Sequence, residues 1–205
     1  MSNVLTKLRV EQKVVVVFDM CSSSNIIEEL TLTDNLSALR SLLINLKRYI
    51  ETEAKDIGFE PYKFTGDGWI LLFSDKVEGK ILIRFINQLS KYFKKLFIEK
   101  IETILERNLA RIGLTFGIEK GPLFRLKMFQ QTEYVGRALN IACRLQSAIK
   151  DNDPNPGYKI LLSNQVYQKY FKEIKDLKFV KVTRILRNIQ GGSKYQCVKV
   201  RLNVS

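Results

Sequence analysis

The stretch VVVVFDM (residues 14–20) decides the fold, because it predicts a short buried strand that ends in a carboxylate, Asp19. A run of valines and a phenylalanine bounded by polar residues is typical of a strand covered on both faces. A second segment, YKFTGDGWILLF (62–73), predicts two strands joined across a tight turn, since the glycines of GDG permit a turn that displays Asp67 at its tip. Two carboxylates on rigid strand ends indicate a site for a hard cation such as Mg²⁺, which usually shares its ligands with substrate phosphates. The pair therefore points toward phosphoryl chemistry.

The composition excludes several classes of mechanism. The 205 residues are 45% hydrophobic and 27% charged, which predicts one well-filled core and a single domain over residues 1–205. The chain has no histidine. Catalytic Ser-His-Asp and Cys-His sites and histidine-ligated metals are therefore excluded, and catalysis must use other side chains or a metal held by oxygen.

The cysteines and the N-terminal segment predict a cytoplasmic protein. Cys21, Cys143 and Cys197 are odd in number and widely spaced, which argues against a disulfide framework or a thiolate zinc site. The segment MSNVLTKLRVEQK lacks the apolar run of a signal peptide, and no stretch approaches the ~18 apolar residues of a membrane span. We therefore expect no membrane partner.

The formal net charge of +13 favours a polyanionic partner, either nucleic acid or a phosphate-bearing small molecule. Much of the excess lies on segments such as KYFKKLFIEK (91–100), where lysines at helical spacing are more simply explained as a solvated face. Nucleic acid is therefore the less favoured partner.

Apolar spacing along the rest of the chain predicts alternating strands and helices. Strands are expected at 13–19, 57–63, 69–73, 111–121, 158–162, 177–185 and 194–201. Helices are expected after the polar turn of 21–30, at 34–54 with Asp34 as a cap, at 77–107, at 134–149 and at 163–172, with a loop at 151–157. The pattern predicts an α/β sandwich with one sheet edge or face exposed.

The polar turn CSSSNIIEEL (21–30) follows Asp19 directly and leads into a helix. Backbone N–H groups at such a helix N-terminus bind phosphate, so Ser22, Ser23 and Ser24 are candidate phosphate contacts. The alternative is that one of these serines only caps the helix.

The segment EYVGRALNIACRL (133–145) forms a second group of candidate residues. At ~100° per residue, Arg137, Asn140 and Arg144 fall on one polar stripe, with apolar residues from Val135 to Leu145 opposite. An Asn and an Arg one turn apart can together hold a ribose and a polyphosphate. A solvated helix face is the competing interpretation.

Taken together, FDMCSSS, KFTGDGWILLF, RIGLTFG and EYVGRALNIACRL resemble, in order and spacing, the motifs of class III nucleotidyl cyclases, over roughly residues 13–150. The resemblance implies an α+β fold with a central, mostly antiparallel sheet, flanking helices and a βααββαβ-type core. It also implies two divalent metal ions, Mn²⁺ or Mg²⁺, and attack of the ribose 3′-hydroxyl on the α-phosphorus of a nucleoside triphosphate.

The resemblance implies roles for individual residues. Asp19, Asp67 and the backbone carbonyl of Met20 match the metal ligands, Asn140 matches the ribose-orienting residue, and Arg144 matches the transition-state arginine. Lys63 and Glu133 stand where purine cyclases place their base-reading residues. Lys194 is the candidate for a C-terminal phosphate contact, although RNIQGGSKYQCV (187–198) departs from the usual pattern there. Family members are dimers with sites shared between subunits, and because one chain here carries both sets, a homodimer is expected.

The base remains open on hydrogen-bond grounds, since a Lys donor beside a carboxylate acceptor suits adenine, cytosine or uracil. FDMCSSS and GDGWILLF are most similar to the bacterial Pycsar antiphage cyclases, which implies a uridylate or cytidylate cyclase. The length of Glu133 and the neighbouring Tyr62 could shrink a purine-sized pocket, although Tyr62 could also be a packed strand aromatic. The alternatives are a soluble adenylate cyclase and a non-catalytic nucleotide- or nucleic-acid-binding module.

Overall fold

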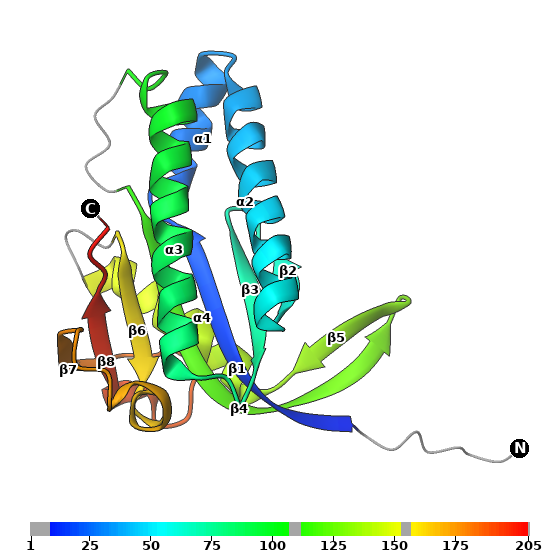
Figure 1. Cartoon of the computed structure of the whole chain (residues 1–205), viewed down its shortest axis with the longest axis vertical. Helices are drawn as coiled ribbons and strands as arrows, with labels where there is room; N and C mark the ends of the chain where they lie inside the picture. The colour runs from blue at the N-terminus through cyan, green and yellow to red at the C-terminus, as the bar shows by residue number, and fades with distance from the viewer. Residues whose placement is uncertain (1–8, 107–111, 153–156, 205) are drawn as a thin grey trace, which may run out of the picture.

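A mixed sheet forms the centre of the structure (Figure 1). The structure, a computed structural model, describes residues 9–106, 112–152 and 157–204. The strand order is β2-β3-β1-β4-β6-β8-β7, with β5 pairing to β4, and the β4–β6 pair is parallel while the other pairs are antiparallel. The strands are β1 (Arg9–Met20), β2 (Glu60–Phe64), β3 (Gly68–Ser74), β4 (Leu114–Met128), β5 (Gln131–Val135), β6 (Lys159–Ser163), β7 (Phe179–Arg184) and β8 (Tyr195–Arg201).

The helices follow the expected order along the chain. They are α1 (Ser23–Leu32), α2 (Leu36–Ile57), α3 (Gly79–Phe97), α4 (Arg137–Asn152) and the short α5 (Asn164–Val166). Single π-helical turns lie at Ile98–Glu102 and Tyr167–Phe171, and a 3₁₀ turn lies at Gly192–Lys194. The order β1-α1-α2-β2-β3-α3-β4 confirms the predicted βααββαβ core and the mostly antiparallel sheet with flanking helices.

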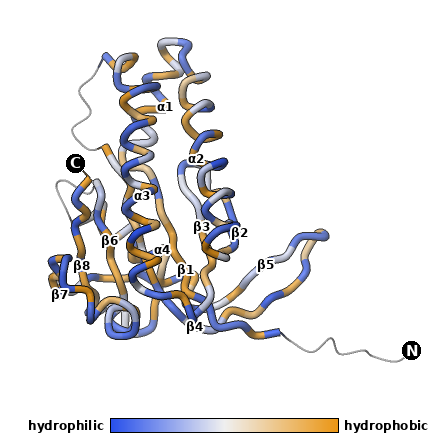
Figure 2. The backbone as a smooth tube through the Cα atoms, in the orientation of Figure 1, coloured by the Kyte–Doolittle hydropathy of each residue, from blue (hydrophilic) through white to orange (hydrophobic). Residues whose placement is uncertain are grey.

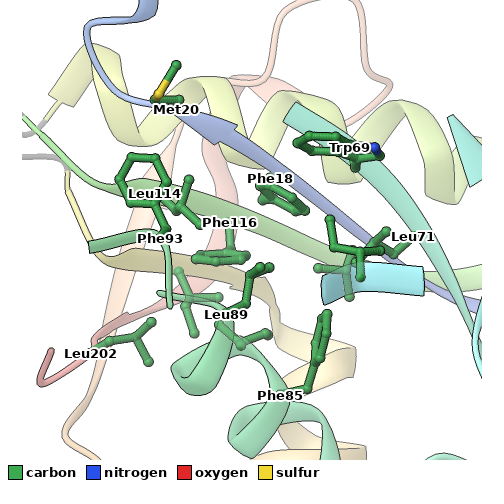
Figure 3. Close-up of a cluster of buried hydrophobic side chains, with 14 of the residues drawn as sticks. Phe18, Met20, Trp69, Leu71, Phe85, Leu89, Phe93, Leu114, Phe116 and Leu202 are labelled. Atoms are coloured by element: carbon green, nitrogen blue, oxygen red, sulfur yellow. The ribbon is translucent and has the colours of Figure 1, made fainter. Parts of the chain in front are cut away.

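The side chains of β1 point alternately to the two faces of the sheet and join two different parts of the hydrophobic core. Val14, Val16 and Phe18 join the main core under α2 and α3, whereas Val15 and Val17 join a second cluster under α4. In the main core Phe18 stacks on Trp69 with ring centroids 5.5 Å apart (Figure 3). Because successive side chains of a strand point to opposite faces, Asp19 lies on the α4 face of the sheet.

The helices that cover the main core are amphipathic. Hydrophobic and hydrophilic residues alternate along α2 and α3 (Figure 2), and Leu39, Leu42, Leu46 and Ile50 of α2 are buried. Burying each such side chain stabilises the fold by roughly 1.5–3 kcal/mol. None of the helices in the described part of the chain is long and apolar enough to cross a bilayer.

Several predicted boundaries were wrong. Asp34 does not cap α2, because it adopts a left-handed conformation with φ of 55° and Asn35 occupies the N-cap position. Helix α3 ends at Phe97 and continues only as a π turn to residue 102, short of the predicted 107. Residue 107, Arg111 of the predicted strand 111–121 and residues 153–156 of the predicted loop lie outside the described ranges.

The helix predicted at 134–149 begins at Arg137, because the preceding residues form β5. Val135 therefore lies in a strand and is exposed, and it is not part of the apolar helix face. Gly136 makes the junction between strand and helix, where a Cβ atom would lie 2.5 Å from the Pro122 carbonyl oxygen. A side chain at this position would prevent β5 from returning so close to β4.

Candidate functional site

The two predicted metal carboxylates lie at neighbouring strand ends, Asp19 in β1 and Asp67 in the turn directly before β3. Asp19 of β1 stands opposite Gly68 of β3, the residue that follows Asp67. A Cβ atom at Gly68 would lie 2.0 Å from the Phe18 carbonyl oxygen, so only glycine lets the GDG turn approach the end of β1. The turn therefore places Asp67 beside the strand position of Asp19, as the sequence predicts.

Asp19 is held from the α4 side of the sheet by two neutral side chains. The Gln146 amide nitrogen lies 2.8 Å from the Thr115 hydroxyl oxygen and 3.4 Å from Oδ2 of Asp19. The Thr115 hydroxyl donates in turn to the Asp19 carbonyl oxygen at 3.3 Å. Both supporting residues are buried, so the end of β1 is a fixed position.

The donor set at this end of the sheet fits a hard divalent cation. Asp19 and Asp67 offer carboxylate oxygens, and Met20, which pairs with β4, offers a backbone carbonyl. Within the described residues there is no group of three or more His, Cys, Asp and Glu side chains that could hold a metal ion. Two carboxylates leave coordination positions for phosphate oxygens and water, which is how Mg²⁺ and Mn²⁺ are commonly held beside nucleotides.

The serine turn after β1 lies at the N-terminus of α1. Ser22 occupies the N-cap position with φ of 57°, and its side chain accepts no capping hydrogen bond, which argues against the capping interpretation. Ser23 is buried and Ser24 is exposed. The Cys21 N–H donates to the Gly113 carbonyl at 2.8 Å, which fixes the turn against the entry to β4. Phosphate contacts by these serines stay a prediction.

The predicted base-reading residues meet across β2 and β5. Strand β2 contains a β-bulge, because Pro61 and Lys63 stand opposite adjacent residues of β3 and Tyr62 is the extra residue between them. The bulge allows two consecutive side chains to reach the same carboxylate. Tyr62 donates a short hydrogen bond to Oε2 of Glu133, and Nζ of Lys63 lies 3.5 Å from the same oxygen.

A second tyrosine supports this arrangement. The Tyr134 N–H donates to the Tyr62 hydroxyl at 3.1 Å, and the Tyr134 hydroxyl donates to Glu60 at 2.9 Å. The two rings pack edge to face with centroids 5.2 Å apart, so Tyr62 is both a packed aromatic and a hydrogen-bonding residue. Burial, followed by the bond to Glu133, raises the pKa of Tyr62. The Tyr62 hydrogen bond, together with Lys63, lowers the pKa of Glu133, so this carboxylate stays ionised and acts only as an acceptor.

The predicted polar stripe of α4 faces solvent. Arg137, Asn140 and Arg144 are exposed, whereas Ala138, Ala142 and Leu145 are buried beneath them. Asn140 and Arg144 lie one helical turn apart, as predicted. The Arg137 guanidinium donates to the Gln190 carbonyl at 3.1 Å, which brings the loop before Lys194 to the N-terminus of the helix. Lys194 itself is exposed at the end of the 3₁₀ turn.

Comparison with solved structures shows that nucleotidyl cyclases have the same fold. The structure is similar to the adenylyl cyclase CyaB from P. aeruginosa, with a TM-score of 0.72 and 21% identity over 96% of this chain and 97% of that chain. This chain has the class III nucleotidyl cyclase fold. It is also similar to the guanylyl cyclase Cya2, with a TM-score of 0.68 and 13% identity over 96% and 95% of the two chains. The guanylate cyclase domain of RhGC from Catenaria anguillulae, in complex with GTP, gives a TM-score of 0.65 at 17% identity, covering 95% of this chain and 99% of that one.

At identities this low the likeness to cyclases establishes the fold alone. No protein-family model and no curated protein sequence matches the chain. The activity must therefore be argued from the residues that the cyclase fold positions.

Sequence reasoning missed four residues that support the site: Thr115, Gln146, Glu60 and Tyr134. One signal was available for Gln146, because it is a polar residue on the otherwise apolar face of α4. The other three depend on contacts between segments that are far apart in sequence.

Proposed function

We propose that the protein is a nucleotidyl cyclase that converts a nucleoside triphosphate into a 3′,5′-cyclic nucleotide and pyrophosphate. The observation that carries the proposal is the pairing of Asp19 with Gly68, which puts two carboxylates at one end of a sheet whose fold is that of adenylyl and guanylyl cyclases. Similar structures have been solved with GTP or with an ATP analogue, which supports a triphosphate substrate for this fold.

The proposed reaction forms a bond between the ribose 3′-oxygen and the α-phosphorus and breaks the bond from the α-phosphorus to the oxygen that bridges it to the β-phosphorus, so that this oxygen leaves with pyrophosphate. The hydroxyl proton leaves to solvent. Divalent ions, when bound, supply positive charge for the phosphates and for the developing alkoxide. Asp19 and Asp67 would bind these ions at the strand ends. Asn140 orients the ribose, and Arg144 neutralises charge that develops on the triphosphate.

For the base, we propose a pyrimidine, with the product acting as a second messenger in antiphage defence. Glu133 is an ionised acceptor beside the Lys63 donor, so uracil could pair its N3–H with the carboxylate and its O4 with the lysine. Tyr62 adds a ring beside this pair, which favours the smaller bases. The antiphage role rests on the resemblance of FDMCSSS and GDGWILLF to Pycsar cyclases.

Adenylate cyclase activity is the second candidate. The same contact between Lys63 and Glu133 offers the donor and the acceptor that the N1 and N6 edge of adenine requires. The similarity to the adenylyl cyclase CyaB fits this candidate equally well.

The proposed active form is a homodimer with sites shared between subunits. Asn140 and Arg144 are exposed on α4, where a second copy could approach them. The hairpin of β4 and β5 extends away from the body of the protein (Figure 1), and its apolar residues Met128 and Phe129 are 47% and 94% exposed. Neighbouring exposed apolar side chains on a projecting hairpin favour a protein interface at this place. We expect Phe129→Asp to weaken the dimer in sedimentation measurements without lowering the melting temperature of the monomer.

Incubation of the purified protein with ATP, GTP, CTP or UTP and Mn²⁺, followed by chromatography of the products, tests the function. Formation of a cyclic nucleotide that Asp67→Asn abolishes is the expected result. A preference for UTP or CTP supports the pyrimidine proposal, and a preference for ATP supports the adenylate candidate. Absence of every cyclic product from a folded dimer would refute the cyclase proposal.

A further inference from the structure

Gln146 is unusual among the residues that α4 turns toward the sheet. Its neighbours on that side are apolar and buried: Ile141, Ala142, Leu145, Ala148 and Ile149. Gln146 is only 6% exposed, and burying an amide destabilises a protein unless its hydrogen bonds are made. The partners of this amide therefore indicate why the position is polar.

A glycine on β4 brings the Gln146 amide to its partners. A Cβ atom at Gly117 would lie 2.1 Å from the Ala142 carbonyl oxygen and 2.4 Å from the backbone nitrogen of Gln146. Helix α4 therefore packs directly on the backbone of β4. Thr115 lies two residues before Gly117 and therefore on the same face of the strand. It also stands opposite Asp19 in the β1–β4 pairing.

The contacts converge on Asp19 from two directions. The Gln146 amide donates to Thr115 at 2.8 Å and lies 3.4 Å from the Asp19 carboxylate, while the Thr115 hydroxyl donates to the Asp19 carbonyl. A lysine or arginine in the same place would neutralise Asp19. A neutral amide orients the carboxylate and leaves its charge for a cation.

We propose that Gln146 and Thr115 are positioning residues for Asp19, which hold its carboxylate in the orientation that binds a divalent cation. The inference rests on the proposed function, because it takes Asp19 as a metal ligand. Hydrogen-bonding partners of metal ligands typically contribute about 10–100-fold to metal affinity.

Titration of the full-length protein with Mn²⁺ alone, followed through the electron paramagnetic resonance signal of the free ion, tests this inference without turnover. We expect Gln146→Met, which keeps the volume and removes the amide, to weaken Mn²⁺ binding about tenfold. Thr115→Val, which replaces the hydroxyl with a methyl group of similar size, should also weaken Mn²⁺ binding. It provides a second test if Gln146→Met fails to fold. Gln165→Met is the control for loss of a glutamine amide away from Asp19, because this exposed residue donates to the buried Glu119 at 2.6 Å.

A double-mutant cycle separates positioning from general destabilisation. In an Asp19→Asn background, Gln146→Met should cause no further loss of Mn²⁺ affinity. In turnover, the variant should need about tenfold more Mn²⁺ for half-maximal rate while KM for the nucleotide at saturating metal is unchanged. Unchanged Mn²⁺ affinity in folded Gln146→Met and Thr115→Val would overturn the inference, as would a wild-type protein that binds no Mn²⁺. A third outcome separates the two proposals. If the wild type binds Mn²⁺ and the substitutions weaken that binding, but the wild type forms no cyclic product, the inference is supported and the proposed cyclase is refuted.

Discussion

Replacing Tyr62 with phenylalanine removes one hydroxyl that serves two neighbours. That hydroxyl donates to Glu133 and accepts from the Tyr134 N–H at 3.1 Å. Without it, Glu133 keeps Lys63 as its one partner among the described residues and can turn away from the position in which we propose it reads the base. We therefore expect Tyr62→Phe to change the choice of base more than the rate on the preferred nucleotide.

Tyr62→Phe should have separate effects on the free energy of unfolding and on the selectivity between nucleotides. Tyr134 is 5% exposed, so its N–H loses a partner that water replaces poorly, while Glu133 is open enough to be rehydrated. The expected loss is about 1.5 kcal/mol in the free energy of unfolding, or a melting temperature lower by about 5 °C. The ratio of kcat/KM between the preferred nucleotide and the next best should fall about tenfold, which corresponds to ~1.4 kcal/mol.

The assay is kcat/KM for UTP, CTP and ATP on the wild type and on the variant, with thermal unfolding of each. Tyr134→Phe is the control, since it removes a hydroxyl from the same aromatic pair but leaves the bond between Tyr62 and Glu133 in place. The control should lose a comparable amount of stability and keep the wild-type preference. Equal preferences in all three proteins would refute the role of Tyr62.

Other expectations follow from the same geometry. Arg144→Ala should lower kcat about a hundredfold or more and change KM little in steady-state kinetics, because we propose that Arg144 neutralises charge that develops during the reaction; a rise in KM alone would contradict this. An equal mixture of Asp67→Ala and Arg144→Ala chains should recover about a quarter of wild-type activity, since half of the dimers would carry one complete site; confirmed heterodimers without activity would refute shared sites. The pKa of Glu133 is lowered from its ordinary value of 4.5, so its stabilising interactions are present above that pH and are lost as the pH falls through the lower, folded-state pKa. The melting temperatures of the wild type and Glu133→Gln should therefore converge only in acid below pH 4.5, and convergence near neutrality would contradict the ionised carboxylate.

The main elements of the fold could be predicted from the sequence because their apolar patterns are strong and local. The valines of β1 and the leucines of α2 reveal a buried strand and an amphipathic helix without knowledge of any partner. Strand β5 was missed because EYV joins a helical pattern without a break, and it is a strand only because it pairs with β4. The Asp34 cap was wrong because a tight turn between α1 and α2 puts that residue in the left-handed region.

In the candidate site, too, the features that depend on local sequence could be predicted and those that depend on contacts between distant segments could not. The positions of Asp19 at the end of the valine strand and of Asp67 in the GDG turn were predictable, because both are local features of the sequence. The support from Gln146 was not, since it depends on the close approach of α4 at Gly117, which joins distant segments. The hydrogen bond from Tyr62 to Glu133, beside the expected contact of Lys63 with Glu133, was not predicted, because simple alternation would send the adjacent side chains of Tyr62 and Lys63 to opposite faces of a strand.

The bulge at Tyr62 lies in β2, which is an edge strand with β3 as its one sheet partner. An insertion or deletion there can slide β2 by one position and exchange the side chains displayed toward Glu133, while the pairing of β1 with β3 that carries both aspartates stays unchanged. If Glu133 and its neighbours read the base as we propose, base preference and the metal carboxylates can therefore change separately in this architecture. Under the proposed function, a length change at the sheet edge is a route to a new nucleotide, and comparison of substituted positions alone would overlook it.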